Sequence, residues 1–441
     1  MVYISYKIHM KISKNIKILL ITFFIILFVY SMFIKHEFTS TNESSRIGSI
    51  QSLVTEHSFE LNTSLWYTND KILINNHFYS DKPPTLAFIH SGVYWILFNF
   101  FHLDFSSNLP VALPVFVFIV IVCMSILSLI FFYKLLYEFG FSDRVCLIMT
   151  LILAFGTVFF PFSVIYNAHI VSAQLVIFSL YILNKKQTKL YHPILLGLFV
   201  GLNATVDILS GAFFLLFISI FYIFYSKKSR KEKILYCIFV SISIIFYLIL
   251  NHSVTGNFIP GALQPTLFSY EGSTFSKSTL SGFYNHSSLP DLFWYAFNSL
   301  IGARGLFIYT PILLFSFLGF YYAWRNNYDH KLIICLIFYI TLSVIFSILF
   351  SSDYSGNSFG IRWYVPLIPV MVFFISFYYD RIRNKKSRVE LIIFYIIVAI
   401  SVIISLIGAF YPWSYELFSI KGNIDYIVSS FRSYFHILNK I

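Results

Sequence analysis

Asn42–Pro84 reads NESSRIGSIQSLVTEHSFELNTSLWYTNDKILINNHFYSDKPP, a polar stretch of more than forty residues that follows the first hydrophobic run of the chain. The surrounding sequence is largely apolar, and this loop gathers charge on one side of a membrane. Its charged residues are Glu43, Arg46, Glu56, Glu60, Asp70, Lys71, Asp81 and Lys82. Because ionisable groups are rare in a membrane chain and mark functional positions, we expect the chemistry of this protein to take place in this loop.

Composition defines the class of protein. Hydrophobic residues make up 58% of the chain and charged residues 11%, and the mean hydropathy is +0.76. An average soluble domain has roughly 25% charged residues, so this composition predicts a polytopic membrane protein. The four cysteines lie in apolar stretches without CxxC or Cys/His spacing, which favours neither a disulfide framework nor a zinc site. They are Cys123, Cys146, Cys237 and Cys335.

Apolar runs of about 17 to 25 residues predict about eleven membrane-spanning helices. They cover residues 16–34, 111–133, 146–166, 168–184, 193–208, 209–226, 234–251, 306–323, 332–350, 363–379 and 389–411. Thr85–Phe101 is also apolar, but as a helix it would be about 25 Å long, short of a ~30 Å hydrocarbon core. We expect it to be interfacial or re-entrant. The fold class is therefore all-α, one integral-membrane domain over residues 1–441 with an external loop at 35–110 and an interfacial tail at 412–441.

The net charge of +12 is explained by topology rather than by nucleic-acid binding. With a cytoplasmic N terminus, 21 of the 31 lysines and arginines fall in cytoplasmic segments, as the positive-inside rule requires. If Thr85–Phe101 were a span, every later loop would change sides and the basic clusters would face outward. The pattern predicts a cytoplasmic N terminus and no nucleic-acid partner.

The start of the polar loop has the pattern of a helix. Thr41 or Asn42 is expected to cap it, and the helix would lie flat on the membrane. Its apolar positions recur at three and four residues; they are Ile47, Ile50 and Val54. Glu43 lies in the first turn, where it would form a surface ion pair with Arg46. The alternative interpretation is that Glu43 is a general base, because partial desolvation raises a carboxylate pKa.

The end of the loop, His77–Pro84, combines charge with a double proline. The two prolines hold an extended segment ahead of a helix and fix the direction of Asp81 and Lys82. One interpretation is a capped turn with a solvated charge pair. The other is an acid for a sugar hydroxyl or a metal, next to a lysine for phosphate.

Four later residues lie at the external ends of predicted spans. His169 lies in a tight hairpin, where most histidines only cap a turn, and Asp207 lies near a span end, where a carboxylate usually has a partner or a task. Arg304 and Arg362 each begin a span. They would either extend to lipid headgroups or bind a polyprenyl phosphate, because the guanidinium fork matches phosphate geometry.

The two loop clusters resemble those of GT-C membrane glycosyltransferases, in particular the protein O-mannosyltransferase and lipid A aminoarabinose transferase branch. Members carry an acidic pair that opens a short helix in the first external loop, followed by a (Y/F)-x-(D/E)-K-P-P stretch. Here these are Asn42-Glu43 and Phe78–Pro84, and the resemblance covers roughly the first hundred residues. Where the branch usually has aspartate this chain has Asn42, so the carboxylate role falls on Glu43 and a divalent cation stays an open question.

The resemblance implies an enzyme of the cytoplasmic membrane. It would take a sugar from a polyprenyl-phosphate carrier and give it to a glycan, lipid or protein acceptor on the external face. Glu43 would be the base and Asp81 a second catalytic carboxylate. The substrate-binding residues would be Arg46, Lys82, His169, Asp207, Arg304 and Arg362.

Two other functions stay open from the sequence. A transporter or lipid flippase would place ionisable residues and broken helices at the membrane midplane, between repeats. A polysaccharide polymerase or ligase would use a lipid pyrophosphate, and the external segment Asn251–Pro290 is long enough to serve it.

Overall fold

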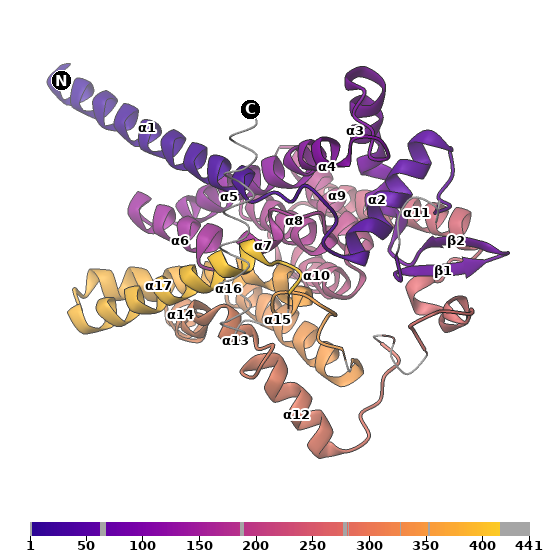
Figure 1. The fold of residues 1–441 in the computed structure, drawn as a ribbon. Coiled ribbons are helices and arrows are strands. Elements are labelled where there is room, and N and C mark those ends of the chain that lie inside the picture. The colour runs from indigo at the N-terminus through magenta and orange to yellow at the C-terminus, as the bar shows by residue number, and fades with distance from the viewer. Residues whose placement is uncertain are drawn as a thin grey trace.

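The structure, a computed structural model, describes residues 2–61, 68–185, 189–276, 280, 282–326, 328–351 and 353–414. Within these residues the regular structure is helical except for one antiparallel hairpin, β1 (Lys71–Ile74) and β2 (His77–Ser80) (Figure 1). The side chains of residues 2–16 and most of the expected C-terminal tail, residues 415–441, lie outside the described part.

The helical bundle follows the predicted spans. Each predicted span overlaps a helix or a run of consecutive helices. They are α1 (Val2–Met32), α4 (Leu109–Val117) with η1 (Phe118–Val122) and α5 (Cys123–Glu138), α6 (Asp143–Phe155), α8 (Ala168–Leu183), α9 (Tyr191–Val206), α10 (Ile208–Ile220) with η2 (Phe221–Tyr225), α11 (Arg230–Thr255), α13 (Leu306–Tyr309) with η5 (Pro311–Leu314) and α14 (Phe315–Arg325), α15 (His330–Phe350), η6 (Arg362–Leu367) with α16 (Ile368–Asn384), and α17 (Arg388–Phe410).

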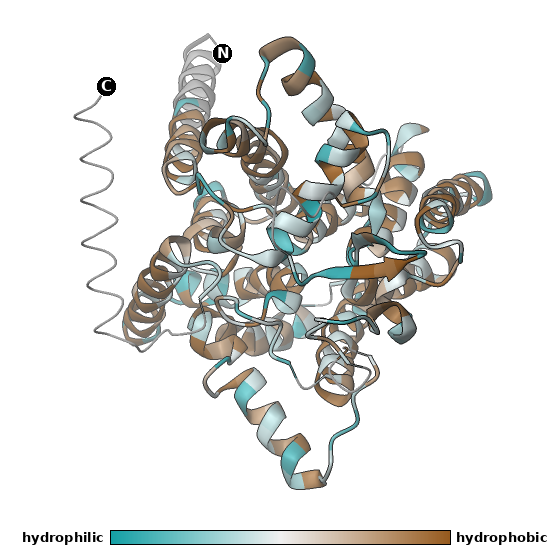
Figure 2. Cartoon of the chain, turned by 45° about the vertical axis from the view of Figure 1, so that its right-hand side comes forward, coloured by the Kyte–Doolittle hydropathy of each residue, from teal (hydrophilic) through white to brown (hydrophobic). Residues whose placement is uncertain are grey.

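Length and composition make this a multi-pass membrane protein. In the described part, six of these helices or helical runs are long and apolar enough to cross a membrane, and three shorter apolar helices accompany them. Figure 2 shows the bundle helices coloured mostly as hydrophobic. One predicted span, 146–166, is broken: α6 ends at Phe155 with Gly156 as its C-cap, and the short α7 (Phe159–Phe162) follows, where Pro161 cannot donate a helical hydrogen bond. The all-α polytopic fold class is confirmed.

Small residues let the bundle helices pack closely. A Cβ atom at Gly197 of α9 would lie 2.5 Å from the carbonyl oxygen of Tyr236 in α11. In α14, a Cβ atom at Gly319 would lie 2.0 Å from the carbonyl oxygen of Phe374 in α16. Such close backbone approach is typical of membrane helix pairs. Lipid tails are as apolar as the helix surfaces, so there is no hydrophobic driving force between the helices and close packing must hold them together.

Helix α2 (Thr41–Thr55) departs from its prediction in two ways. Its N-cap is Ser40, whose side chain accepts from the backbone N–H of Asn42. Every residue of 42–52 is buried, so the expectation of a surface helix with a solvated polar side is wrong. The reason is tertiary: β2 and α3 (Pro84–Phe101) pack against α2, and serines on the helix allow the close approach.

The segment after α11 covers the hairpin from another side. It contains η3 (Gly261–Leu263) and η4 (Pro265–Phe268), and α12 (Leu289–Leu300) follows it. Ile72 of β1 forms a small core with Phe268 and Leu280, and the Tyr270 hydroxyl donates to the Lys71 carbonyl at 3.3 Å. Helix α2, the hairpin and this segment therefore form one layer at one end of the bundle (Figure 1).

Candidate active site

The hairpin determines which carboxylates meet. Its turn, Asn75–Asn76, has φ values of 50° and 67°, the left-handed conformation that a two-residue type I′ turn requires and asparagine tolerates. The resulting register pairs Lys71 with Ser80. The residues just outside this pair, Asp70 and Asp81, are consequently brought to the same place.

Lys82 bridges these two carboxylates. Its Nζ lies 2.8 Å from Oδ2 of Asp70 and 2.8 Å from Oδ2 of Asp81. The side chains are only 17%, 13% and 10% exposed, in the order Lys82, Asp70, Asp81. Of the two interpretations of this segment, the solvated charge pair is therefore wrong, because the ions form a buried triad. The ammonium has three N–H donors, so two are used here and one remains for a ligand.

Asn42 connects the triad to α2. Its side-chain N–H donates to Oδ2 of Asp70 at 3.2 Å, and its Oδ1 accepts from Nε of Arg46 at 3.1 Å. Burial alone would raise the pKa of Asp70, but the nearby Lys82 ammonium and the Arg362 charge outweigh it and hold that pKa below its usual range. Burial and the Asp70 charge raise the pKa of Asp81, because Lys82 offsets them only in part.

Two arginines point toward this centre. Arg46 is 7% exposed and bonds to Asn42, so the expected ion pair with Glu43 is wrong: the two side chains leave α2 in different directions. Arg362 stacks on Trp413, with its guanidinium carbon 5.1 Å from the ring centroid, and its buried Nε has no hydrogen-bond partner within the described residues. Arg362 therefore turns into the protein rather than toward lipid headgroups.

Glu43 is enclosed on the other side of α2. One oxygen accepts from the backbone N–H and hydroxyl of Thr39 at 3.1 and 3.0 Å, and the other accepts from the backbone N–H of Tyr166 at 3.2 Å. The side chain is buried, and burial raises its pKa to about 7 although these donors favour the charged form. The indole N–H of Trp413 favours that form as well, without the geometry of a hydrogen bond.

His169 and Asp207 form a second buried pair. Asn167 caps α8, which places His169 in its first turn, with Nδ1 2.7 Å from Oδ2 of Asp207. Asp207 lies at the break between α9 and α10 and thus has a partner, while His169 does more than cap a turn. Arg304 lies elsewhere: its Nη1 donates to the carbonyl of Ser358 at 3.1 Å and braces the loop that leads to Arg362.

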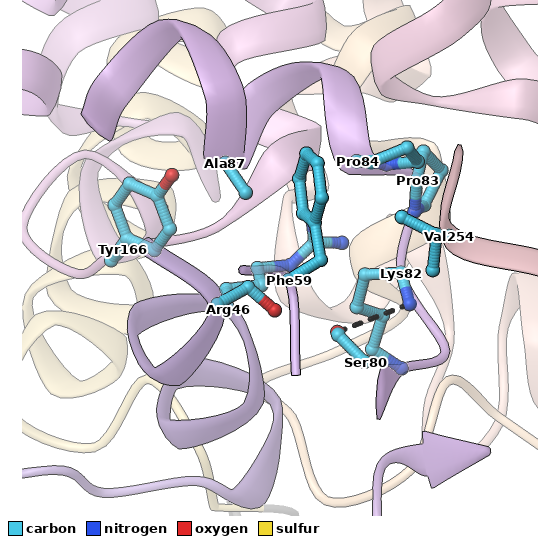
Figure 3. Close-up of a pocket in the computed structure, with 10 residues that line it drawn as sticks. Arg46, Phe59, Ser80, Lys82, Pro83, Pro84, Ala87, Tyr166 and Val254 are labelled. Atoms are coloured by element: carbon cyan, nitrogen blue, oxygen red, sulfur yellow. Dashed lines mark hydrogen bonds between the residues drawn. The ribbon is translucent and has the colours of Figure 1, made fainter. Parts of the chain in front are cut away.

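A pocket opens beside the triad, between α2, the start of α3 and the end of α11 (Figure 3). Arg46 and Lys82 both line it, and Tyr166 and Phe59 form part of its wall. A second pocket shares the Lys82–Pro84 wall and adds Asp81, Tyr247 and Asn251. Both pockets are narrow. Each has a cavity volume of about 10 Å³, roughly enough for one water molecule.

Within the described part of the chain, Oδ1 of Asp81 is a buried oxygen without a hydrogen-bond partner. It belongs to a residue that lines the second pocket, whereas Glu43 lines neither. Leaving a buried oxygen without a hydrogen bond costs free energy of folding, so this oxygen is well suited to accept a hydrogen bond from a ligand.

Sequence reasoning missed Asp70 and Tyr166. The signal for Asp70 was available, because an Asn-Asn turn between two short β-like runs predicts a hairpin, and the hairpin register brings Asp70 to Asp81. Tyr166 had no such signal. No group of three His, Cys, Asp or Glu suited to a metal occurs in the part of the chain that the structure describes. Between Asp70 and Asp81, the place that a cation would take is filled by the Lys82 ammonium.

The helical bundle carries a polar layer at one end. Among solved structures it is similar to ArnT from Cupriavidus metallidurans, in a crystal structure bound to undecaprenyl phosphate. The TM-score is 0.52 and the sequence identity 12%, and the match covers 82% of this chain and 59% of ArnT. No family model and no curated protein matches the sequence. The comparison confirms the expected fold, and this chain spans less than two thirds of the length of ArnT.

Proposed function

We propose that this protein is a membrane glycosyltransferase. It transfers a sugar from a polyprenyl-phosphate donor to an acceptor on the external face of the cytoplasmic membrane. The observation that carries the proposal is that Lys82 lines two adjoining pockets on a GT-C-like fold, one of which is also lined by Arg46 and the other by Asp81, a carboxylate with an unpaired buried oxygen. The lipid class follows from ArnT, whose crystal structure contains undecaprenyl phosphate.

The cations suit a departing phosphate. Lys82 has one N–H left to donate to an oxygen, and the planar guanidinium of Arg46 can donate two parallel hydrogen bonds to a phosphate. Arg362 adds a third positive charge near this site, since its guanidinium interacts electrostatically with both Asp70 and Asp81. In a site of low dielectric, such charges stabilise the negative charge that develops on the leaving group.

The base is one of two carboxylates, and the geometry favours Asp81 over Glu43, the base expected from the sequence. Glu43 has a useful pKa of about 7, but three donors already occupy its oxygens. Asp81 has a raised pKa and an open oxygen. In the proposed step, the acceptor hydroxyl gives its proton to Asp81 and attacks the anomeric carbon. The carbon–oxygen bond to phosphate breaks, and the electron pair leaves with the phosphate.

Substrate entry requires the pocket to widen, because its free room of about 10 Å³ is far below the size of a sugar. Phe59 and the Pro83–Pro84 wall line the space that would have to open (Figure 3). His169 and Asp207 form a rigid pair at the Tyr166 side, where we propose that they orient the sugar or the acceptor.

The test supplies purified protein in liposomes with a panel of radiolabelled polyprenyl-phosphate sugars and acceptor lipids or glycans. We expect label to be transferred, and Asp81→Asn to lower the rate by about 10²–10⁴-fold, the usual range for general base catalysis. Glu43→Gln is the comparison: a large loss there with near-normal Asp81→Asn would return the role of base to Glu43. Lys71→Ala, which removes a lysine that packs over the Phe78 ring, is the matched control. Movement of labelled lipid across the bilayer without transfer would identify a flippase instead.

A further inference from the structure

Another cavity lies far from the proposed active site, between α5, α8 and α9. Helix α8 packs against both neighbours, and the groove over it has an open volume of about 930 Å³. Its walls are apolar, with Leu127 and Phe131 from α5, Phe178 from α8 and Leu195 and Phe199 from α9. This volume lies in the range of sites that bury a whole ligand.

One end of this groove is polar and basic. Lys185 pairs with Glu138 and donates to the Tyr181 hydroxyl at 2.6 Å. Lys189 stands at the same end, and Lys228 reaches it through a 2.6 Å hydrogen bond to the Lys185 carbonyl. The charges of Lys185, Lys189 and Lys228 all act on His192, which lines the groove. The carboxylates near these lysines are Glu138 and Glu232, so three ammonium groups against two carboxylates leave an excess of positive charge at the mouth of an apolar groove.

The two ends of α8 separate this mouth from the active site. The helix begins next to Tyr166 and runs for 16 residues before Lys185, about 24 Å at 1.5 Å per residue. A phosphate at Lys82 and a phosphate at Lys189 therefore lie at opposite membrane faces. In the topology that the basic residues predict, the Lys189 face is cytoplasmic.

We propose that this groove binds an anionic phospholipid of the cytoplasmic leaflet. Its acyl chain lies against Phe131, Phe178 and Phe199, and its phosphate lies at Lys189 and Lys228. The argument is charge complementarity at one end and an apolar wall at the other, the arrangement by which basic pockets between membrane helices bind acidic headgroups. Met124 and Leu127 are 38% and 40% exposed, so the groove is open toward the lipid phase.

The test is native mass spectrometry of the full-length protein, released from detergent and titrated with phosphatidylglycerol or with phosphatidylcholine of the same chains. We expect discrete binding of phosphatidylglycerol and weak binding of phosphatidylcholine. Lys189→Glu should weaken the former by at least about fivefold, the contribution of one lysine near an acidic lipid. Leu127→Trp, which fills the groove without changing charge, should also weaken it.

Lys331→Glu is the matched control, because this lysine packs over Tyr225 and does not line the groove, and it should leave binding unchanged. Thermal unfolding of each variant verifies that it folds. Equal binding of both phospholipids, or no effect of Lys189→Glu in a folded protein, would overturn the proposal. Displacement of phosphatidylglycerol by polyprenyl phosphate would overturn it too, because the groove would then hold the donor. None of these outcomes depends on transferase activity.

Discussion

Asn42 shows why an amide suits the first turn of α2. It donates to Asp70 and accepts from Arg46, so it matches a negative and a positive neighbour at once. An aspartate here would bring a second carboxylate within about 3.2 Å of Asp70. Like charges at this distance disfavour ionisation of both groups. The carboxylate at position 70 and the amide at position 42 are therefore a consistent pair.

This pairing predicts a pH-dependent defect in Asn42→Asp. At pH 8 both carboxyls would be charged, and we expect the variant to lose about 1–3 kcal/mol of stability. At pH 5 one carboxyl can keep its proton and bond to the other, so the loss should shrink. Thermal unfolding at both pH values measures the difference. Asn42→Ala removes both hydrogen bonds without adding charge, and a similar pH dependence in that variant would contradict the explanation.

Glu43 should make the protein less stable as pH rises. Burial raises its pKa from 4.5 to about 7 in the folded state, so between these values the folded protein holds a proton that the unfolded chain has lost. Stability is then highest below about pH 4.5 and falls until about pH 7, by up to about 3 kcal/mol. Glu43→Gln should flatten this fall. Unfolding midpoints at pH 5 and pH 8 test it, and an unchanged slope in the variant would show that other groups cause it.

Residue pairs were the hardest feature to predict from the sequence. The pattern indicated Glu43, Arg46, Asp81 and Lys82 as candidates, but it paired neighbours in the chain: Glu43 with Arg46. The structure pairs Lys82 with Asp70 as well, across a hairpin, and His169 in the first turn of α8 with Asp207 at the junction of α9 and α10. Such partners are set by strand register and by helix packing, which a linear reading of charges does not contain.

At the scale of elements, the hairpin is the part on which the triad depends. A β-branched residue in the left-handed conformation of Asn76 is strained by roughly 1–2 kcal/mol, whereas glycine is not. We therefore expect Asn76→Val to disturb the Lys71–Ser80 register and to lower transfer, and Asn76→Gly to keep both. The assay is donor turnover together with thermal unfolding. Equal activity of the two variants would mean that Lys82 is held in place without the hairpin.

Helix α2 illustrates how far local pattern reaches. Its helical character follows from spacing, and the prediction of its start was wrong by one or two residues, because Ser40 provides the cap. The burial of α2 could not be predicted from its local sequence, because a segment with this many polar residues is typical of a surface helix. Only the cover supplied by β2 and α3, segments that lie later in the chain, makes those polar residues interior.

At the scale of the molecule, hydropathy was sufficient to predict the helical bundle. Membrane helices must form all their backbone hydrogen bonds internally, and the thickness of the bilayer sets their length. Hydropathy did not predict the break between α6 and α7 within one expected span. It also did not predict the contacts between the hairpin and the segment after α11. Those contacts join residues near 72 and near 268, so both segments must lie on the same side of the membrane.

This shared side gives a topology prediction with an internal check. Single cysteines at His77, exposed on the hairpin, and at Ser273, in the segment that packs against it, should react with an impermeant maleimide added to intact cells. A cysteine at Ser229, which caps α11 at the opposite end, should react only after the membrane is permeabilised. The unmodified chain, with its four cysteines, provides the background. Reaction at Ser229 with protection of the other two sites would invert the topology and move the proposed active site to the cytoplasm. Opposite behaviour of His77 and Ser273 would contradict the packing itself, because no orientation of the membrane separates two segments that share a core.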